Sequence, residues 1–97
     1  MNERHAFRHN AAEMRYELDV ENERAVVEYI RDGRTLFLTH TGVPPTLEGR
    51  GIGSELVRAV LEDVRRQELR IVPQCPFVAA YIRRHPEWEP LLADKQG

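Results

Sequence analysis

The feature that most constrains this chain is a run of alternating glycines directly before a strongly amphipathic segment. After Gly49, Gly51 and Gly53, apolar residues recur at helical spacing, namely Ile52, Leu56, Val57, Val60, Leu61 and Val64. This spacing predicts a helix over residues 52–67 with one buried face. The first amides of a helix have no partners within it, and the helix dipole adds positive charge there. The segment therefore predicts a phosphate-binding site, with a flexible loop and a glycine N-cap as the simpler alternative.

Two other phosphate-binding motifs do not fit the same segment. The dinucleotide fingerprint, started at Gly49, requires a glycine where Ser54 stands. A P-loop requires a lysine next to the last glycine, and no lysine lies near. The glycines therefore predict a phosphate cradle that belongs to neither of these nucleotide-binding classes.

Upstream of the glycines, the pattern predicts three antiparallel strands. Residues 14–20 alternate apolar with charged side chains, which is typical of a strand with one face in water. Residues 25–30 and 35–41 are rich in β-branched and aromatic side chains, and Asp32-Gly33 between them predicts a two-residue hairpin loop. Residues 1–12 are polar and predict a tail or a short edge strand.

Downstream, the pattern predicts a β-α-β unit and a C-terminal helix. Residues 69–72 predict a strand parallel to residues 35–41, because the long helix connects the two. A second helix begins at Pro76, and we expect its buried face to carry Phe77, Val78, Tyr81 and Ile82. A last short helix would hold Trp88, Leu91 and Leu92. The predicted class is α/β with a mixed (α+β) sheet, in a single small domain over residues 1–97.

Composition narrows the range of partners. The formal net charge is −2, which gives no electrostatic reason to expect a nucleic acid. No apolar run approaches the roughly 20 residues of a membrane span, and residues 1–9 lack the apolar core of a signal peptide. Cys75 is the only cysteine, and the histidines make no metal-binding pattern with it. We expect a cytoplasmic protein, monomeric or weakly dimeric, with no membrane, nucleic-acid or metal partner.

The glycine segment resembles the acyl-coenzyme A motif of the GNAT N-acetyltransferase superfamily, Gln/Arg-x-x-Gly-x-Gly/Ala. Gly51 and Gly53 take the glycine places, and Glu48 stands where the motif has Gln or Arg. The backbone cradle is independent of that side chain, and Arg50 can supply a cation. The resemblance implies that coenzyme A or acetyl-coenzyme A, as cosubstrate, is bound by Gly49, Arg50, Gly51, Ile52, Gly53 and Ser54.

Two further segments make the resemblance more specific. With His40–Pro45 and Pro73–Val78, the loop is similar to the compact, roughly 100-residue branch of the superfamily, sometimes called the YjdJ type. The likeness runs from about residue 14 to residue 88. It implies a GNAT-like fold in which the coenzyme's pantetheine arm enters a gap between two parallel strands, here residues 35–41 and 69–72.

Cys75 and His40 are the candidate catalytic residues. Cys75 lies after a strand and beside a helix N-terminus, a position that favours a nucleophilic thiolate, although a lone cysteine is as often a small buried hydrophobe. Family resemblance favours a site role for it. His40 ends the neighbouring parallel strand, so it could accept a proton from an amine or from Cys75. Its alternative is a strand-end histidine bonded to the backbone.

The sequence is compatible with three functions. The first is an N-acetyltransferase that moves an acetyl group from acetyl-coenzyme A to an amine on a small molecule or a protein, either directly or through Cys75. The second is a non-catalytic module that binds coenzyme A or a protein partner. The third is a thioester sensor that becomes acetylated on Cys75. The acceptor amine itself is not predicted.

Overall fold

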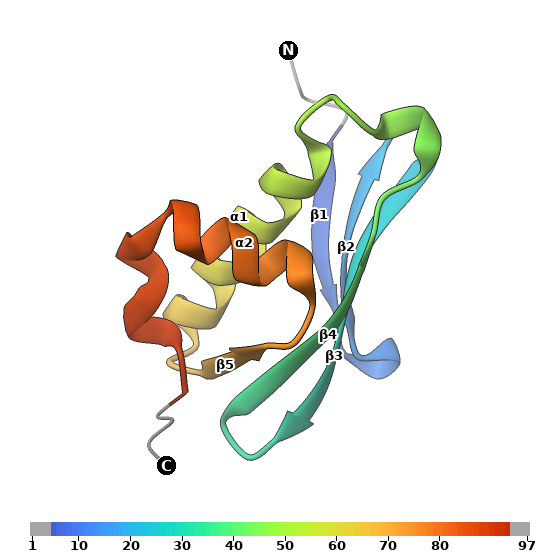
Figure 1. Ribbon diagram of the computed structural model, residues 1–97. Helices are drawn as coiled ribbons and strands as arrows, with labels where there is room; N and C mark the ends of the chain where they lie inside the picture. The colour runs from blue at the N-terminus through green and yellow to red at the C-terminus, as the bar shows by residue number, and fades with distance from the viewer. Residues whose placement is uncertain (1–4, 94–97) are drawn as a thin grey trace.

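The strands and helices follow the predicted order, in a computed structural model that describes residues 5–93 (Figure 1). Residues 1–4 of the predicted tail, and residues 94–97, lie outside the described part. The elements are β1 (Ala6–Asn10), β2 (Arg15–Val20), β3 (Glu23–Asp32), β4 (Thr35–Gly42), α1 (Ile52–Arg66), β5 (Arg70–Pro73) and α2 (Pro76–Arg84). Three short 3-10 turns cover Ala11–Glu13, Pro45–Leu47 and Pro86–Leu91.

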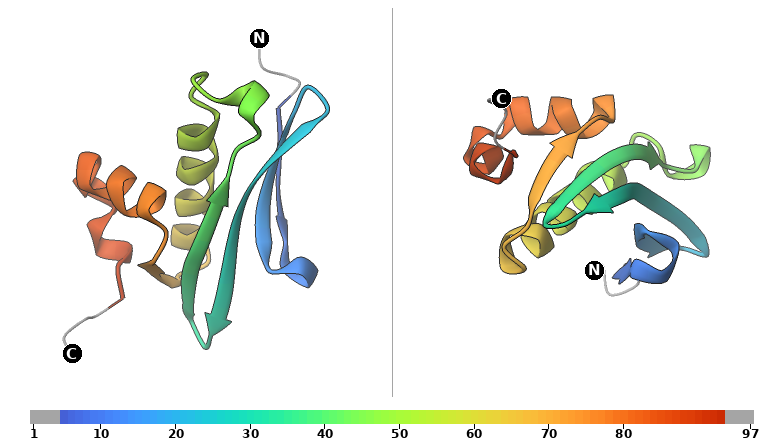
Figure 2. Two further views of the ribbon diagram at one scale, coloured as in Figure 1. Left: turned by 45° about the vertical axis from the view of Figure 1, so that its right-hand side comes forward. Right: turned by 90° about the horizontal axis from the view of Figure 1, so that it is seen from below.

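The five strands form one mixed sheet in the order β1-β2-β3-β4-β5. The first four are antiparallel neighbours, and β5 runs parallel to β4 from Thr35↔Arg70 to Leu38↔Pro73. The predicted fold class and the parallel pair around the helix are therefore confirmed. Because β4 runs on to Gly42 after this pairing ends, the two strands part toward their C-terminal ends, as the right-hand view of Figure 2 shows.

The β3–β4 hairpin differs from the prediction in its register. Its loop is Gly33-Arg34 rather than Asp32-Gly33, and Asp32 pairs with Thr35 as the last residue of β3. Gly33 has φ +63°, while Asp32 and Arg34 have negative φ values. A turn with positive φ only at its first central position is of type II′, which takes glycine there. The predicted Asp-Gly loop would have required a left-handed Asp32.

One irregularity in β4 could not be foreseen from the alternation of residues. Tyr29 pairs with Leu38, but Glu28 pairs with His40, so Thr39 is an extra residue on β4. Its hydroxyl donates a hydrogen bond to the Glu28 carbonyl, at 3.2 Å between oxygens. A bulge of this kind reverses which face the following side chains take. The bulge therefore decides where His40 points.

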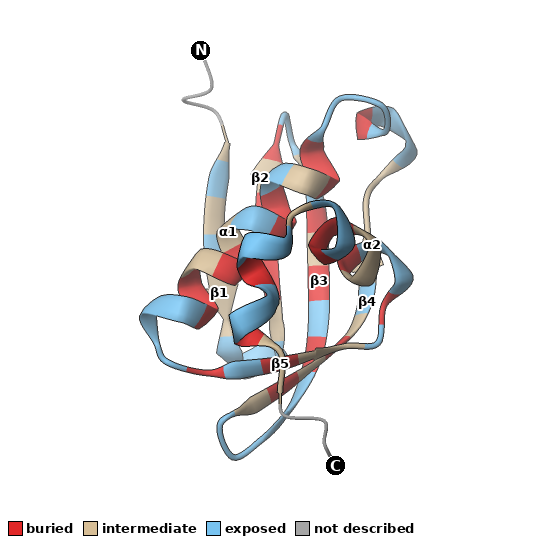
Figure 3. Cartoon of the chain, turned by 60° about the vertical axis from the view of Figure 1, so that its left-hand side comes forward, coloured by how far each residue is buried: buried red, intermediate tan, exposed pale blue. Residues whose placement is uncertain are grey.

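The apolar stripe of α1 is confirmed. All six residues that define it are buried, and α1 packs against β2, β3 and β5 (Figure 3). The buried face of α2 is only partly as predicted: Val78, Tyr81 and Ile82 are buried, whereas Phe77 is 38% exposed. Phe77 is at the start of α2, where it lies across the first turn of α1 rather than in the core.

The C-terminal segment is anchored as expected, but by a 3-10 turn. Trp88 and Leu91 are buried, and the guanidinium carbon of Arg65 lies 4.7 Å from the centre of the Trp88 ring. Leu92 follows the turn and is half-buried, forming an isolated bridge with Ile71. A cation over an aromatic face joins α1 to this segment.

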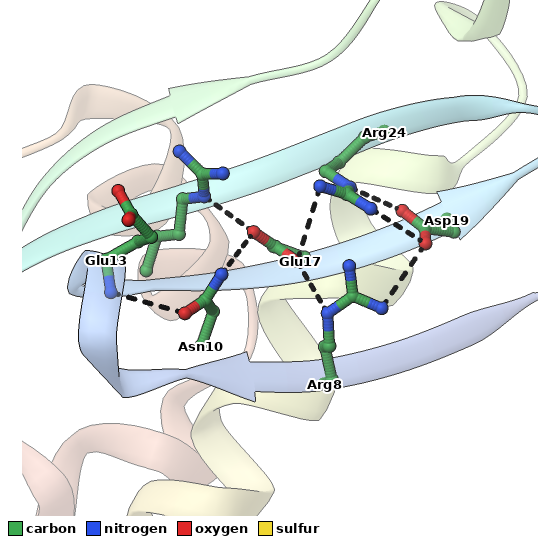
Figure 4. A network of polar contacts seen from close by, with 7 residues as sticks. Arg8, Asn10, Glu13, Glu17, Asp19 and Arg24 are labelled. Carbon is green, nitrogen blue, oxygen red and sulfur yellow. Dashed lines mark hydrogen bonds and ion pairs between the residues drawn. The ribbon is translucent and has the colours of Figure 1, made fainter.

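The sheet face that was predicted to lie in water contains a fully buried carboxylate. Glu17 is 0% exposed because the side chains of Arg8, Arg15 and Arg24 cover it (Figure 4). Its Oε2 accepts hydrogen bonds from Arg15 and from Asn10, at 2.6 and 3.0 Å. Its Oε1 makes no hydrogen bond of good geometry, but lies 2.7 Å from the Arg8 Nε. The charged residues that alternate along β2 thus belong to an ion-pair network on this face of the sheet and are not simply solvated.

Burial alone would raise the pKa of Glu17, but its surroundings outweigh that effect. The hydrogen bonds from Arg15 and Asn10, with the charges of Arg24 and Arg8, lower the pKa to about 2. Glu17 is therefore ionised at neutral pH, inside a ring of arginines that bridges β1, β2 and β3.

Candidate functional site

The predicted phosphate cradle lies in a cleft between the start of α1, the end of β4 and the start of α2. The cleft has a volume of about 420 Å³. Five of the six predicted coenzyme residues line it, and Arg50 does not. The lining residues are Thr41, Val43, Leu47, Glu48, Gly49, Gly51, Ile52, Gly53, Ser54 and Phe77.

Two of the glycines are required by the backbone itself. Gly49 and Gly51 have φ values of +80° and +78°, which side-chain-bearing residues rarely adopt. A Cβ at either position would meet no heavy atom within 4 Å, so the loop presents open backbone to the cleft. Gly51 is the N-cap of α1 and provides no capping side chain, which leaves the first-turn amides free for an anion. This geometry fits a phosphate group.

Gly53 has a different role from the other two. A Cβ here would lie 2.7 Å from the Phe77 Cζ, closer than real Cβ contacts. Gly53 therefore allows the Phe77 ring to lie directly on the first turn of α1. Three further lining residues were not predicted from the sequence, namely Thr41, Val43 and Phe77. The position of Phe77 next to the helix-starting Pro76, in the segment carrying the family likeness, was the available signal.

Arg50 points away from the cleft and makes a bidentate ion pair with Glu21. Its two terminal nitrogens donate to the two carboxylate oxygens at 3.0 and 2.9 Å. Hydrogen bonding to Arg50 and its charge lower the pKa of Glu21. Glu48 is the charged residue among the cleft-lining side chains. The guanidinium of Arg50, which was expected to face the phosphate, is therefore paired with the β2–β3 turn instead.

Cys75 lies at the junction of β4, β5 and α2. It is the N-cap of α2, its N–H donates to the Leu38 carbonyl at 2.9 Å, and its side chain is 4% exposed. Its thiol donates to the Thr41 hydroxyl, at 3.0 Å from sulfur to oxygen. Because Thr41 lines the cleft, Cys75 stands immediately behind the cleft wall.

The structure does not bring His40 to Cys75. His40 is exposed and pairs with the exposed Glu28, whereas Thr41 pairs with the buried Val27 on the side of α1. Cross-strand partners share a face, so His40 and the Thr41–Cys75 contact lie on opposite faces of the sheet. The bulge at Thr39 is the cause. The His40 ring covers Gly42 instead, where an added Cβ would lie 3.3 Å from its Nε2.

Two other hollows are less suited to a phosphate-bearing ligand. The larger, about 770 Å³, lies at the β2–β3 turn and is lined by Asp19, Glu21 and Glu23 with Asn22 and Arg24. Three carboxylates there would repel a diphosphate. A groove of about 550 Å³ between α1 and α2 shares Ser54 with the cleft and so continues it. The cleft lined by the glycines is therefore the hollow best suited to a phosphate-bearing ligand.

Comparisons with known proteins agree with this fold. The model of the GCN5-related N-acetyl-transferase family matches residues 15–91. The NATD1 proteins of Xenopus tropicalis and Homo sapiens are each 33% identical over 66 residues, which is 67% of this chain and 61% and 58% of theirs. The chain thus spans about three fifths of the length of these relatives. The solution NMR structure of a GCN5-like protein from Staphylococcus aureus superposes with a TM-score of 0.71 and 26% identity, covering 93% of this chain and 89% of that one.

The fold and the glycine-started helix define the class of N-acetyltransferase domains, in which a β-α-β unit follows an antiparallel sheet. The family match covers most of the chain, and the superposition covers nearly all of it. The chain belongs to the GCN5-related N-acetyltransferase family. Within the part of the chain that the structure describes, no helix has the length and hydropathy of a membrane span.

Proposed function

We propose that this chain binds acetyl-coenzyme A in the cleft at the start of α1 and transfers the acetyl group to an amine. The observation that carries the proposal is the open backbone at Gly49 and Gly51, directly before the uncapped start of α1. Backbone N–H groups of Ile52, Gly53 and Ser54 would receive the diphosphate. Membership of the family supports the acetyl donor.

The gap between β4 and β5 is suited to the pantetheine arm. Beyond Leu38, no strand in residues 5–93 pairs with the β5-facing edge of β4, so its backbone groups are free for an extended ligand. The cleft next to the end of β4 includes the apolar side chains of Val43, Leu47 and Phe77 in its lining. An acetyl thioester in this gap would lie near Thr41 and Cys75.

Transfer needs an amine, a proton acceptor and stabilisation of the oxyanion. The amine nitrogen forms a bond to the thioester carbonyl carbon, the carbon–sulfur bond breaks, and coenzyme A leaves as the thiolate, which takes up a proton. Free N–H groups of β4 past Leu38 can donate to the oxyanion. His40 is the candidate acceptor of the ammonium proton for an amine that approaches from the outer face of the sheet.

Direct transfer fits the geometry better than a Cys75 acyl-enzyme. In the covalent route the Cys75 sulfur attacks the thioester and its proton passes to the departing coenzyme. Cys75 donates its hydrogen bond to a hydroxyl, not to a base, and His40 lies across the sheet. Cys75→Ala should therefore keep turnover. Lost turnover with retained coenzyme binding, together with an adduct of roughly 42 Da on wild-type Cys75, would support the covalent route instead.

The binding claim is tested by calorimetry with coenzyme A and acetyl-coenzyme A. Gly51→Asp should abolish binding, because it adds bulk and negative charge at the phosphate position. Gly33→Asp is the matched control, since Gly33 also has positive φ and open space but lies in the distant β3–β4 turn. No binding by the wild-type protein at millimolar ligand would contradict the proposal.

Turnover with a panel of amines then separates the functions. Release of coenzyme A that depends on the amine would identify an acetyltransferase and begin to define the acceptor. Binding without turnover for any small amine or peptide would favour the non-catalytic coenzyme A module. Acetylation of Cys75 without onward transfer would favour the thioester sensor.

A further inference from the structure

A pair of charged side chains connects the glycine-rich loop to the turn between β2 and β3. Arg50 lies between the two glycines with positive φ, and both carboxylate oxygens of Glu21 accept hydrogen bonds from its guanidinium. Glu21 belongs to the tight turn between β2 and β3, where Glu21 and Asn22 themselves have φ values of +54° and +67°. The pair therefore joins two turns that are 29 residues apart in the sequence.

The loop needs such a tie because its own sequence does little to hold it. Glycine at two of three successive positions leaves the backbone many alternatives in the free chain. Its internal hydrogen bonds run from the Leu47 and Glu48 N–H groups to Pro44 and Pro45, and from Glu55 to Gly51. In none of these bonds does the backbone of Gly49 or Arg50 donate or accept. The planar, two-pronged contact of a guanidinium with a carboxylate fixes both position and direction there.

The placement of Arg50 also argues against a direct contact with phosphate. Its neighbours Gly49 and Gly51 line the cleft, and Arg50 does not. With its side chain directed to Glu21, the loop presents backbone to the cleft on one side and is anchored on the other. A bound diphosphate would meet the amides while the ion pair stays intact.

We propose that Glu21 and Arg50 form a clamp that holds the glycine-rich loop in the conformation that receives the coenzyme's diphosphate. This inference rests on the proposed function for its ligand, but not for its structural part. Glu21 and Arg50 are positioning residues: they act on coenzyme binding through the backbone of residues 49–54. The clamp links the first hairpin of the sheet to the cofactor site.

The direction in which one substitution changes the affinity for coenzyme A separates this role from its alternative. In Glu21→Gln, a clamp role predicts coenzyme A binding about two- to fivefold weaker, the range expected for loss of one exposed bidentate pair. If Arg50 instead contacted phosphate and Glu21 competed for it, the same variant would bind more tightly. Glu23→Gln is the control, because Glu23 lies beside the same turn and makes no ion pair among residues 5–93.

The deciding measurement combines binding with amide hydrogen exchange of residues 49–54 in the ligand-free protein. Glu21→Gln should speed that exchange, and Glu23→Gln should not. The charge-reversed double variant, Glu21→Arg with Arg50→Glu, should restore slow exchange and bring affinity within about twofold of wild type. Restored exchange with binding still weak would overturn the positioning role, because it would mean that the Arg50 charge itself is needed.

The two proposals fail in different ways. Wild-type protein that does not bind coenzyme A contradicts the proposed function, while the exchange rates still decide whether the clamp exists. Wild-type protein that binds, with exchange and affinity unchanged in Glu21→Gln, overturns the clamp and leaves the proposed function standing. Tighter binding by Glu21→Gln overturns the clamp in the same way.

Discussion

The three glycines of the cofactor loop serve two different physical purposes. Gly49 and Gly51 are needed for their left-handed backbone, and a side chain there would have room but would be strained. Gly53 has no positive φ, and it is needed because the Phe77 ring occupies the space of a Cβ. The family motif does not distinguish a glycine needed for its backbone conformation from one needed for its lack of a side chain. Substitutions can distinguish the two.

Gly53→Ala should lower coenzyme affinity with little effect on stability. The new methyl displaces the Phe77 ring and narrows the cleft. Alanine is favoured over glycine in a helix by about 1 kcal/mol, which offsets the strain, so the free energy of unfolding should change by less than about 1 kcal/mol. Calorimetry and thermal unfolding measure both. In a Phe77→Leu background the effect of Gly53→Ala on affinity should shrink; an equal effect in both backgrounds would contradict the contact.

Glu17 should make the protein sensitive to acid. Its pKa is about 2 in the fold and 4.5 ordinarily, so its contribution to stability is fully present above pH 4.5 and is lost as pH falls toward 2. Glu17→Gln should destabilise the protein at pH 7 by about 1–3 kcal/mol, because it removes charge-assisted hydrogen bonds. Urea unfolding at several pH values should show the difference from wild type shrinking between pH 4.5 and 2.

Glu28→Gln is the control for that experiment. Glu28 lies on the same sheet face, is exposed, and makes no ion pair within residues 5–93. Its substitution should leave both the stability and the acid dependence unchanged. A Glu17→Gln variant whose stability tracks that of Glu28→Gln at every pH would show that the arginine ring contributes nothing through Glu17.

At the scale of elements, a buried polar contact as well as the apolar stripe attaches α1 to the sheet. The Tyr16 hydroxyl of β2 donates to Asp63 Oδ2 at 2.8 Å, and Arg66 and Gln67 also donate to Asp63, each at 2.6 Å. Burial, then the hydrogen bond to Asp63, raise the pKa of Tyr16, so the hydroxyl keeps its proton. Asp63 therefore sets how α1 sits across β2.

Asp63→Ala should destabilise the fold by about 1–3 kcal/mol, because it leaves the buried Tyr16 hydroxyl without an acceptor. Glu62→Ala removes the neighbouring carboxylate, which pairs with Arg58 at the surface, and should cost no more than about 0.5 kcal/mol. Chemical denaturation of both variants measures the two changes. Equal effects would mean that the Tyr16 contact does not contribute to docking the helix.

The identity and order of the elements could be predicted from the sequence, because each carries its own period or turn chemistry. The stripe of α1 and the alternation of β2 depend only on nearby residues. The β3–β4 register and the bulge at Thr39 depend on competition between turn types and on cross-strand pairing, which local patterns do not contain. The burial of Glu17 likewise arises from arginines on three strands.

For the whole molecule, the same dependence on contacts between distant segments decides which residues of the candidate site could be predicted from the sequence. The glycine loop could be located because its backbone chemistry is local and its family likeness is specific. The prediction that His40 could take a proton from Cys75 rested on both residues lying at the C-terminal ends of neighbouring parallel strands, and one extra residue in β4 puts them on opposite faces of the sheet. Phe77 and Thr41 enter the cleft only when α2, β4 and the start of α1 meet. Contacts between distant segments were therefore the part that sequence could not supply.

Alkylation of Cys75 tests whether those segments close on the coenzyme as one unit. The chain has one cysteine, so modification reports a single place, where β4, β5 and α2 meet. Because Cys75 is 4% exposed and its thiol is hydrogen-bonded to Thr41, alkylation should be much slower in the native protein than in urea. Bound coenzyme A fills the cleft and opposes the local opening that exposes the Cys75 thiol. A coenzyme A concentration about ten times the dissociation constant should therefore slow alkylation roughly tenfold. Gly51→Asp should lose that protection while keeping the slow native rate. Protection that survives in Gly51→Asp would place the coenzyme elsewhere than the glycine loop.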